Sequence, residues 1–297
     1  DYYISSPQIS DGKIYIGSGD GNLYAVNPET GKVLWKYFAG SRIRSTPCIY
    51  DGLIYFGDFS GKVYALDLKT QRAKWIYETE GSRIRIEDFG FDRSALVSSP
   101  TITGNSLLIG SREGCLYCLD LETGKLNWKD DQKMSWVIST PSVYKENVIA
   151  GTSDGHFVKS LNIKSGAESW RYKTGKPVWS SISITGDIVY GGDYDGNFFA
   201  LSAENGNELW KFKTGDRIHS SSVVHNGVVY FGSDDGYLYA ITGSDKISGR
   251  RQKAKKAVYW EELKGYNYFV NKTDEFIKNF FAAEGYDLLD SQQLKIF

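Results

Sequence analysis

Short runs in which apolar and polar residues alternate recur along most of the chain, and tight-turn residues separate them. One example is the series of runs at residues 53–56 and 62–66 and a last run ending on Trp75, preceded by the small-residue segment 45–49. The separators are pairs such as Asp-Gly, Ser-Gly and Thr-Gly, because glycine adopts a positive φ at little cost. Alternation broken by such turns predicts four short antiparallel strands in a meander.

This four-strand unit returns at a regular interval. The glycine of its second turn falls at positions 21, 61, 114, 155, 196 and 236, which gives intervals of 40, 53, 41, 41 and 40 residues. Four strands recurring at about 40 residues are typical of β-propeller blades, since one sheet buries both faces only when neighbours pack on it. We therefore predict an all-β fold, a β-propeller of four-stranded antiparallel blades. Six repeats are visible, the intact protein could have more, and the longest interval places an insertion at residues 80–93.

The sixth repeat lacks the tryptophan on which the other five end. Two ways of completing its sheet are open. A strand that precedes Asp1 could supply the missing edge, or residues 257–261, which include Trp260, could do so.

The composition changes after residue 243, and this change predicts the domain organisation. Residues 1–243 are the propeller, residues 244–256 are a basic linker, and residues 257–297 are a short α/β segment. In the last segment we expect a strand at 257–260, a helix that Thr273 caps and that runs to Glu284, and a strand at 286–289. We interpret it as the truncated start of a second domain or as a small cap packed on the propeller.

Composition and charge exclude several classes of partner. The net charge of the 297 residues is −1, so no global field attracts nucleic acid. No apolar run approaches the roughly 20 residues that a transmembrane helix needs. The sequence has no signal peptide and starts at Asp1, and we interpret it as a processed fragment. Three cysteines give no even disulfide framework.

The stretch at residues 25–35, AVNPETGKVLW, resembles the tryptophan-docking motif of the PQQ-type (quinoprotein-like) β-propeller repeat. Similar stretches end on Trp75, Trp128, Trp170 and Trp210, and the resemblance covers roughly residues 1–243. We expect each indole to cover the Thr-Gly turn of the neighbouring blade and to donate its N–H to a backbone carbonyl there. The resemblance also implies a periplasmic or extracellular location.

The residues before each inner strand occupy matching positions, at 2–4, 42–44, 95–97, 136–138, 177–179 and 217–219. Most other positions of the repeat keep one residue class, whereas these vary and include Arg, His and Trp. In a propeller they form one rim of the central channel, where cations and aromatic rings suit an anionic or planar ligand or an acidic peptide. The insertion enters the same rim. The predicted ligand- or partner-binding residues are Arg42, Arg44, Arg83, Arg85, Trp136, Trp179, Arg217 and His219.

A plainer interpretation of these positions stays open. The rim could be a solvated surface whose arginines pair with nearby carboxylates such as Glu87 and Asp88. The insertion, which also carries Phe89, Phe91 and Arg93, is as compatible with disorder as with function, as long loops on repeat scaffolds are.

The sequence predicts neither a metal site nor a cofactor. Cys115 and Cys118 have the CxxC spacing of a zinc site, but residues three apart on a strand point to opposite faces. Residues 193–197 resemble the start of a calcium loop that lacks its later glutamate. In the quinoprotein dehydrogenases that share the repeat, calcium, carboxylates, an arginine, a tryptophan and an adjacent cysteine pair hold the quinone on the axis. This chain has no adjacent cysteines, and no carboxylate or amide at the inner-strand positions could bind calcium beside the quinone. PQQ with calcium is therefore not expected.

These observations predict a non-catalytic scaffold that recognises a protein, peptide or glycan at its channel rim. The resemblance makes the outer-membrane assembly lipoprotein of the BamB type the nearest functional analogue. The alternative is enzymatic: a PQQ-dependent or sugar oxidoreductase, or the accessory propeller of a catalytic domain missing from this fragment.

Overall fold

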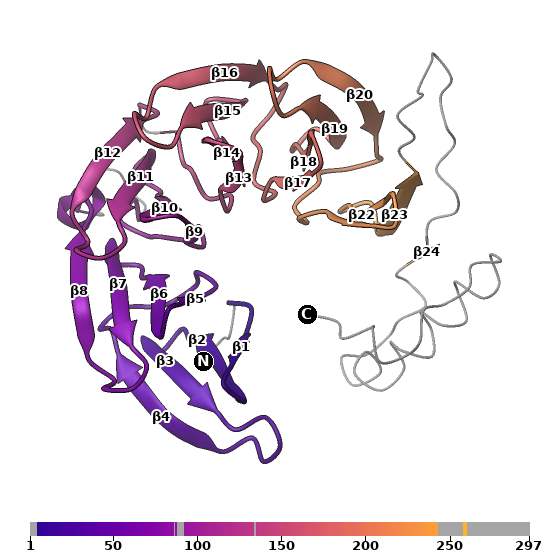
Figure 1. The fold of residues 1–297 in the computed structure, drawn as a ribbon. Helices are drawn as coiled ribbons and strands as arrows, with labels where there is room; N and C mark the ends of the chain where they lie inside the picture. The colour runs from indigo at the N-terminus through magenta and orange to yellow at the C-terminus, as the bar shows by residue number, and fades with distance from the viewer. Residues whose placement is uncertain (1–4, 86, 88–91, 134, 243–257, 260–297) are drawn as a thin grey trace.

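The computed structural model describes residues 5–85, 87, 92–133, 135–242 and 258–259. Its strands form six four-stranded antiparallel sheets, each made of consecutive strands. The sheets, here called blades 1 to 6, follow one another around an arc whose first strands lie on the inside (Figure 1). This arrangement confirms the predicted β-propeller of four-stranded blades. Among the described residues, no helix has the length and hydropathy needed to cross a membrane.

The bounds of the strands repeat closely from blade to blade. Blade 1 contains β1 (Gln8–Ser10), β2 (Lys13–Gly17), β3 (Asn22–Val26) and β4 (Val33–Phe38). Blade 2 contains β5 (Cys48–Tyr50), β6 (Leu53–Gly57), β7 (Lys62–Asp67) and β8 (Ala73–Glu78). Blade 3 contains β9 (Thr101–Thr103), β10 (Ser106–Gly110), β11 (Cys115–Asp120) and β12 (Leu126–Asp131).

The second half of the described chain continues the series. Blade 4 contains β13 (Ser142–Tyr144), β14 (Asn147–Gly151), β15 (Phe157–Asn162) and β16 (Glu168–Lys173). Blade 5 contains β17 (Ser183–Thr185), β18 (Ile188–Gly192), β19 (Asn197–Ser202) and β20 (Glu208–Lys213). Blade 6 contains β21 (Val223–His225), β22 (Val228–Gly232), β23 (Tyr237–Thr242) and β24 (Val258–Tyr259). A 3₁₀ helix, η1 (Glu80–Arg83), opens the insertion after β8.

Strand β24 completes the sheet of blade 6. It pairs antiparallel with β23, with Tyr237 opposite Tyr259 and Leu238 opposite Val258. Of the two completions that the sequence left open, the structure therefore has the one supplied by residues 257–261. Trp260, the linker at 244–256 and the helix expected from Thr273 to Glu284 lie outside the described residues.

The inner strands are shorter than predicted, and the outer strands are longer. In blade 2 the inner strand begins at Cys48 and not at Ser45, and the outer strand continues past Trp75 to Glu78. The hydroxyl of Ser45 replaces part of the missing ladder, because Oγ donates to the carbonyl of Gly57 at 2.8 Å and accepts its N–H at 2.9 Å. The same serine–glycine exchange occurs in blades 1, 4, 5 and 6.

The second turn of the repeat also shows one departure from the expected pattern. The predicted glycine has a positive φ in every blade except blade 4. There, His156 takes the left-handed conformation, with φ 53°, so the turn is displaced by one residue from Gly155.

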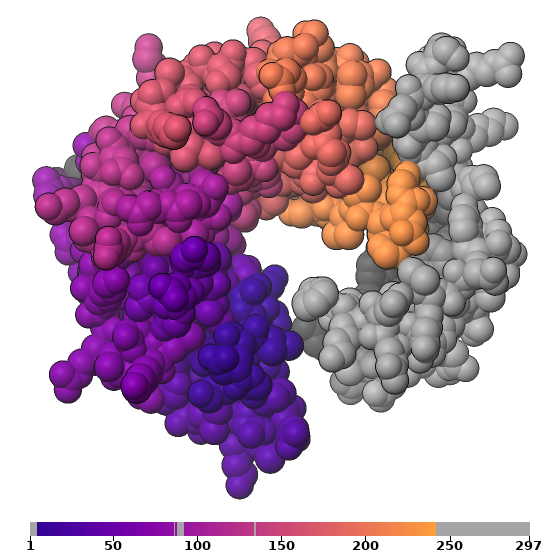
Figure 2. All heavy atoms as spheres, in the orientation of Figure 1, coloured from indigo at the N-terminus to yellow at the C-terminus, as the bar shows by residue number. Residues whose placement is uncertain are grey.

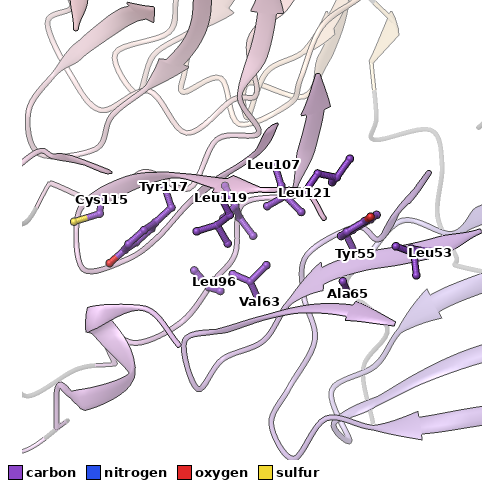
Figure 3. Packing of buried hydrophobic residues seen from close by; sticks show 11 residues of the cluster. Leu53, Tyr55, Val63, Ala65, Leu96, Leu107, Cys115, Tyr117, Leu119 and Leu121 are labelled. Carbon is purple, nitrogen blue, oxygen red and sulfur yellow. The ribbon is translucent and has the colours of Figure 1, made fainter. Parts of the chain in front are cut away.

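The hydrophobic core is divided among the interfaces between adjacent blades. Five clusters of buried residues each join two neighbouring sheets. In the cluster between blades 2 and 3, Tyr55 and Val63 lie on one side and Leu107 and Tyr117 on the other (Figure 3). No sheet is a domain of its own, because each one buries its faces against its neighbours.

The outer-strand tryptophans seal three of these interfaces. The Nε1–H of Trp75 donates to the carbonyl of Leu121 at 3.0 Å, that of Trp128 to Ile163 at 2.6 Å, and that of Trp170 to Ala203 at 3.0 Å. The acceptors lie in the last turns of the following blades, where the expectation placed them.

The inner ends of the blades are joined by side-chain hydroxyls. The N–H of Ser6 donates to Thr46 Oγ1 at 3.1 Å, and that of Thr46 to Ser99 Oγ at 2.9 Å. Blades 4, 5 and 6 are linked in the same way, from Thr140 to Ser181 and from Ser181 to Ser221, at 3.1 Å each. The concave side of the arc is open in the space-filling view, so these strands face a hollow (Figure 2).

Candidate functional site

The candidate site is the rim, formed by the connections at 42–44, 95–97, 136–138, 177–179 and 217–219 and by the turns they cross. The middle N–H of each connection donates to the turn of the preceding blade, as Ile43 does to Ser18 at 3.0 Å. The next turn then donates back to the connection, as Phe59 does to Arg42 at 2.8 Å. Both bonds recur at the other four connections. The backbone of the rim is therefore a continuous hydrogen-bonded chain that alternates between connections and turns.

Each connection is also fixed by the side chain of its middle residue. These residues are all at most 1% exposed and are Ile43, Leu96, Val137, Val178 and Ile218. Each packs on the glycine that ends the second strand, so closely that a Cβ on Gly192 would lie 2.3 Å from Cγ2 of Ile218. The side chains on either side of the buried residue are thus the ones presented at the rim.

Aromatic side chains gather where the rim passes from blade 3 to blade 6. The aromatic row comprises Trp136, Trp179, Tyr194 and His219. The ring centroids of Trp136 and Trp179 are 6.2 Å apart with planes 29° apart, and those of Trp179 and His219 are 5.7 Å apart with planes 16° apart. Tyr194 lies against both Trp179 and His219, at 4.4 and 4.5 Å. Both indoles and Tyr194 are half-buried, which fixes their positions while leaving part of each ring in solvent.

Cations lie at both ends of the aromatic row. The guanidinium carbon of Arg112 lies 4.2 Å from the ring centroid of Trp136, and that of Arg217 lies 5.5 Å from the ring centroid of Tyr194. Such placement over a ring face is favourable for an arginine. Burial raises the pKa of Tyr194, and the nearby Arg217 opposes that rise.

Arg217 also has carboxylate partners. Its Nε lies 3.2 Å from Asp234 and 3.7 Å from Asp216, and Nδ1 of His219 lies 3.8 Å from the same Asp234 carboxylate. For Arg217 the plainer interpretation of paired rim arginines therefore holds, with Asp234 and Asp216 as its partners.

A second group of cations lies where the rim passes from blade 2 to blade 3. The arginine sector comprises Arg44, Arg93 and Arg112. Arg44 is exposed and lies 5.1 Å from the ring centroid of Phe59, whereas Arg93 is buried. Burial lowers the pKa of Arg112, and the neighbouring charges of Arg44 and Arg93 lower it further, against the opposing effect of Asp92.

Most of the predicted site residues are brought to one rim, while two belong to another place. Arg42, Arg44, Trp136, Trp179, Arg217 and His219 all flank buried middle residues of connections. Arg83 and Arg85 are exposed at the start of the insertion, where Glu80 of η1 pairs with Lys129 of the outer strand β12. Arg93, at the other end of the insertion, returns to the rim. A binding role for these residues stays a prediction.

Sequence reasoning missed the contribution of the turns. Phe59, Arg112, Tyr194 and Asp234 occupy one repeat position, two residues after the glycine that ends the second strand. The same position is Gly19 in blade 1 and Ser153 in blade 4, so it is as variable as the connections. That variability could have indicated that the turns contribute to the rim. The surrounding Asp and Gly residues indicated only that a turn is present.

The inner strands do not offer the ligands of a calcium-held quinone. Their axial ends carry serine and threonine hydroxyls, which are engaged with glycine backbones and neighbouring strands. Within the described residues, no cluster of three or more His, Cys, Asp or Glu could hold a metal ion. Cys115 and Cys118 are buried in different interfaces, toward blade 2 and toward blade 4.

Comparison with known proteins identifies relatives at the level of family and fold. The model of the family described as outer membrane protein assembly factor BamB matches residues 4–90, 80–211 and 158–252. Among solved structures, BamB from Moraxella catarrhalis is 18% identical and superposes with a TM-score of 0.69, over 87% of this chain and 77% of that one. The computationally designed Ika8 protein is 20% identical, with a TM-score of 0.66 over 80% of this chain and 70% of the other.

A curated enzyme shares a shorter stretch. The quinoprotein ethanol dehydrogenase of Pseudomonas putida is 33% identical over 67 residues, which are 23% of this chain and 11% of the enzyme. The match therefore spans about a tenth of that enzyme's length.

Proposed function

The chain belongs to the family of the outer membrane protein assembly factor BamB, and from this premise we propose that it is a non-catalytic scaffold whose rim binds a protein partner. The observation that carries the proposal is the aromatic row with an arginine over each end. Tryptophan, tyrosine and arginine are the residues that dominate binding energy at protein interfaces. A periplasmic or extracellular location is part of the same proposal.

The rigidity of the rim supports this role. Each connection is fixed by two backbone hydrogen bonds and one buried side chain, so its rim side chains need little ordering when a partner binds. Preorganisation of this kind leaves more of the interaction energy as affinity. Trp179 adds to it, because its Nε1–H donates to Ser153 Oγ at 3.1 Å and holds the indole against the turn of the preceding blade.

We expect the partner to place an extended segment or an edge across the aromatic row, with apolar groups on the indoles and acidic groups toward the arginines. A redox function is not favoured, since the enzyme relative matches a short stretch and the inner-strand hydroxyls do not suit a calcium-held quinone.

The proposal is tested by truncating the row and measuring complex formation in the cell envelope. A photo-crosslinking residue at position 179 should give one discrete protein adduct, and that protein is then purified as the probe. Trp136→Ala with Trp179→Ala should weaken its binding by about 2 kcal/mol or more, or about 30-fold in Kd.

The matched control is Leu209→Ala, which removes an apolar side chain that is 50% exposed on the outer strand β20. Its binding should equal that of the wild type. Full affinity in a folded double variant would show that the partner docks elsewhere on the propeller.

A further inference from the structure

The arginine sector has a feature that protein binding at the aromatic row does not require. Three arginines lie there on neighbouring segments that the backbone joins: Arg44 on the connection into blade 2, Arg93 at the end of the insertion, and Arg112 on the second turn of blade 3. The charges of Arg44 and Arg93 both act on Arg112. Unrelated surface arginines avoid one another, because like charges at short range repel. Such a gathering is stable when something negative is placed among the charges.

The backbone fixes this gathering in place. The N–H of Leu96 donates to Asp58 at 2.9 Å, and the N–H of Arg112 donates to Ala95 at 3.1 Å. Ser94 adds a bond from Oγ to the carbonyl of Phe59 at 2.8 Å. The N–H of Phe59 donates to Arg42 at 2.8 Å and ties in the segment that carries Arg44. The three segments that carry the arginines are thus joined by hydrogen bonds.

The guanidinium groups of Arg44 and Arg112 are each supported on one face. They lie 5.1 Å from the centroid of Phe59 and 4.2 Å from the centroid of Trp136, respectively. A guanidinium that rests on a ring keeps its five N–H donors in the plane of the fork, ready for a two-pronged contact with an oxyanion. Within the described part of the chain, no carboxylate lies within ion-pair distance of either group.

The nearest carboxylates use part of their oxygens on other groups, and Asp92 acts on Arg112 without reaching ion-pair distance. Oδ1 of Asp92 accepts the N–H and the hydroxyl of Ser94, at 2.9 and 2.7 Å. Glu113 and Asp154 act on the buried Arg93, and Oε1 of Glu113 accepts the hydroxyl of Tyr117 at 2.5 Å. These carboxylates stabilise the charge of Arg93 only in part, because burial still lowers its pKa. Arg44 is exposed and Arg112 is half-buried, so both guanidinium groups are more accessible than that of Arg93.

We propose that Arg44 and Arg112 form a binding site for an oxyanion, with Arg93 behind them as a fixed positive charge. The ligand class is a carboxylate or phosphate group whose oxygens are received by the two guanidinium edges. The site shares Arg112 with one end of the aromatic row, so it is tested with small probes and without a protein partner, and its outcome does not depend on whether a partner binds the row.

The test is a titration of the purified protein with two probes, inorganic phosphate and a hexaglutamate peptide, in chloride buffer and without any partner protein. Calorimetry and the rise in Tm report binding, since a ligand that binds only the folded state stabilises it. We expect a saturable response that weakens with salt, as charge-assisted contacts do. The probe that binds more tightly identifies the source of the oxyanion: hexaglutamate indicates an acidic segment, and inorganic phosphate indicates free phosphate.

Arg44→Gln and Arg112→Gln should each lower the affinity for the tighter-binding probe by about tenfold or more, because each loses a charge-assisted hydrogen bond. Arg112→Lys keeps the charge and loses the fork, and should recover part of the affinity.

Arg171→Gln is the matched control. Arg171 lies 4.4 Å from the centroid of Phe157, so it also rests on a ring, but its Nη2 pairs with Glu168 at 2.7 Å. This variant should bind the probe as the wild type does. The proposal is overturned if neither probe binds the wild type, or if binding is unchanged in folded Arg44→Gln and Arg112→Gln proteins.

Discussion

At the residue scale, the contact between a glycine and the middle residue of a connection decides how the rim is held. In blade 5, Gly192 lies against Ile218, and Ser180 Oγ exchanges hydrogen bonds with the glycine N–H and carbonyl, at 2.9 Å each. The absence of a Cβ at this position lets the connection approach the sheet this closely. The side chain of Ile218 then fills the space and is completely buried.

Gly192→Ala is predicted to destabilise the fold by about 1–3 kcal/mol, the usual cost of overpacking, because its Cβ would meet Ile218 Cγ2 at 2.3 Å. The free energy of unfolding in urea measures the effect. Gly175→Ala is the control, since nothing lies within 4 Å of a Cβ there and the position is exposed. Equal stability of the two variants would contradict the close contact.

At the scale of the strand, the outer-strand tryptophans decide whether adjacent sheets stay together. Trp170 of β16 is 7% exposed, and its indole donates to the carbonyl of Ala203 in blade 5. Trp170→Phe keeps an aromatic ring but leaves this buried carbonyl without its donor and opens a small cavity. We expect a loss of about 1–3 kcal/mol in thermal or urea unfolding.

The control for this prediction is Leu209→Ser in the neighbouring outer strand β20. Its side chain is half-exposed, so the change should stay within about 0.5 kcal/mol. A loss no larger in Trp170→Phe than in the control would mean that the indole N–H is not needed at the interface.

The strands and the position of the rim could be predicted from the sequence because both repeat. The regular spacing of the glycines and the tryptophans predicted the blades. The variable residues before each inner strand predicted that Trp136, Trp179 and His219 lie at the rim. That Arg112 and Tyr194 also belong to the rim could not be predicted in the same way. They come to the rim through hydrogen bonds between a turn and the connection that enters the same blade, 17 residues earlier in the chain, which a local pattern does not contain.

At the scale of the whole molecule, stability depends on the packing between sheets. Blade 3 is packed against blade 2 through one cluster and against blade 4 through another, and blade 4 is likewise packed on both faces. Within a blade, the two middle strands are paired on both edges. Blades 2 and 5 are also packed on both faces, but blades 3 and 4 lie farthest along the chain from its described ends, where opening begins. The most protected part of the described chain should therefore be the middle strands of blades 3 and 4.

Hydrogen exchange followed by mass spectrometry tests this gradient. Peptides from β11 and β15 should exchange slowest, and peptides from the outer strands β12 and β16 of the same sheets should exchange faster. Uniform protection across a blade, or outer strands slower than middle ones, would contradict the prediction.

The pairing of one buried position with more accessible neighbours in the connections has a consequence for how such molecules diversify. The buried residue and its glycine hold the backbone, so exposed neighbours such as Arg42, Arg44, Arg217 and His219 can change with little effect on folding. Exchanging only the flanking side chains of one connection for those of another should therefore change the binding specificity of the rim, as changes in variable loops do on a constant antibody framework.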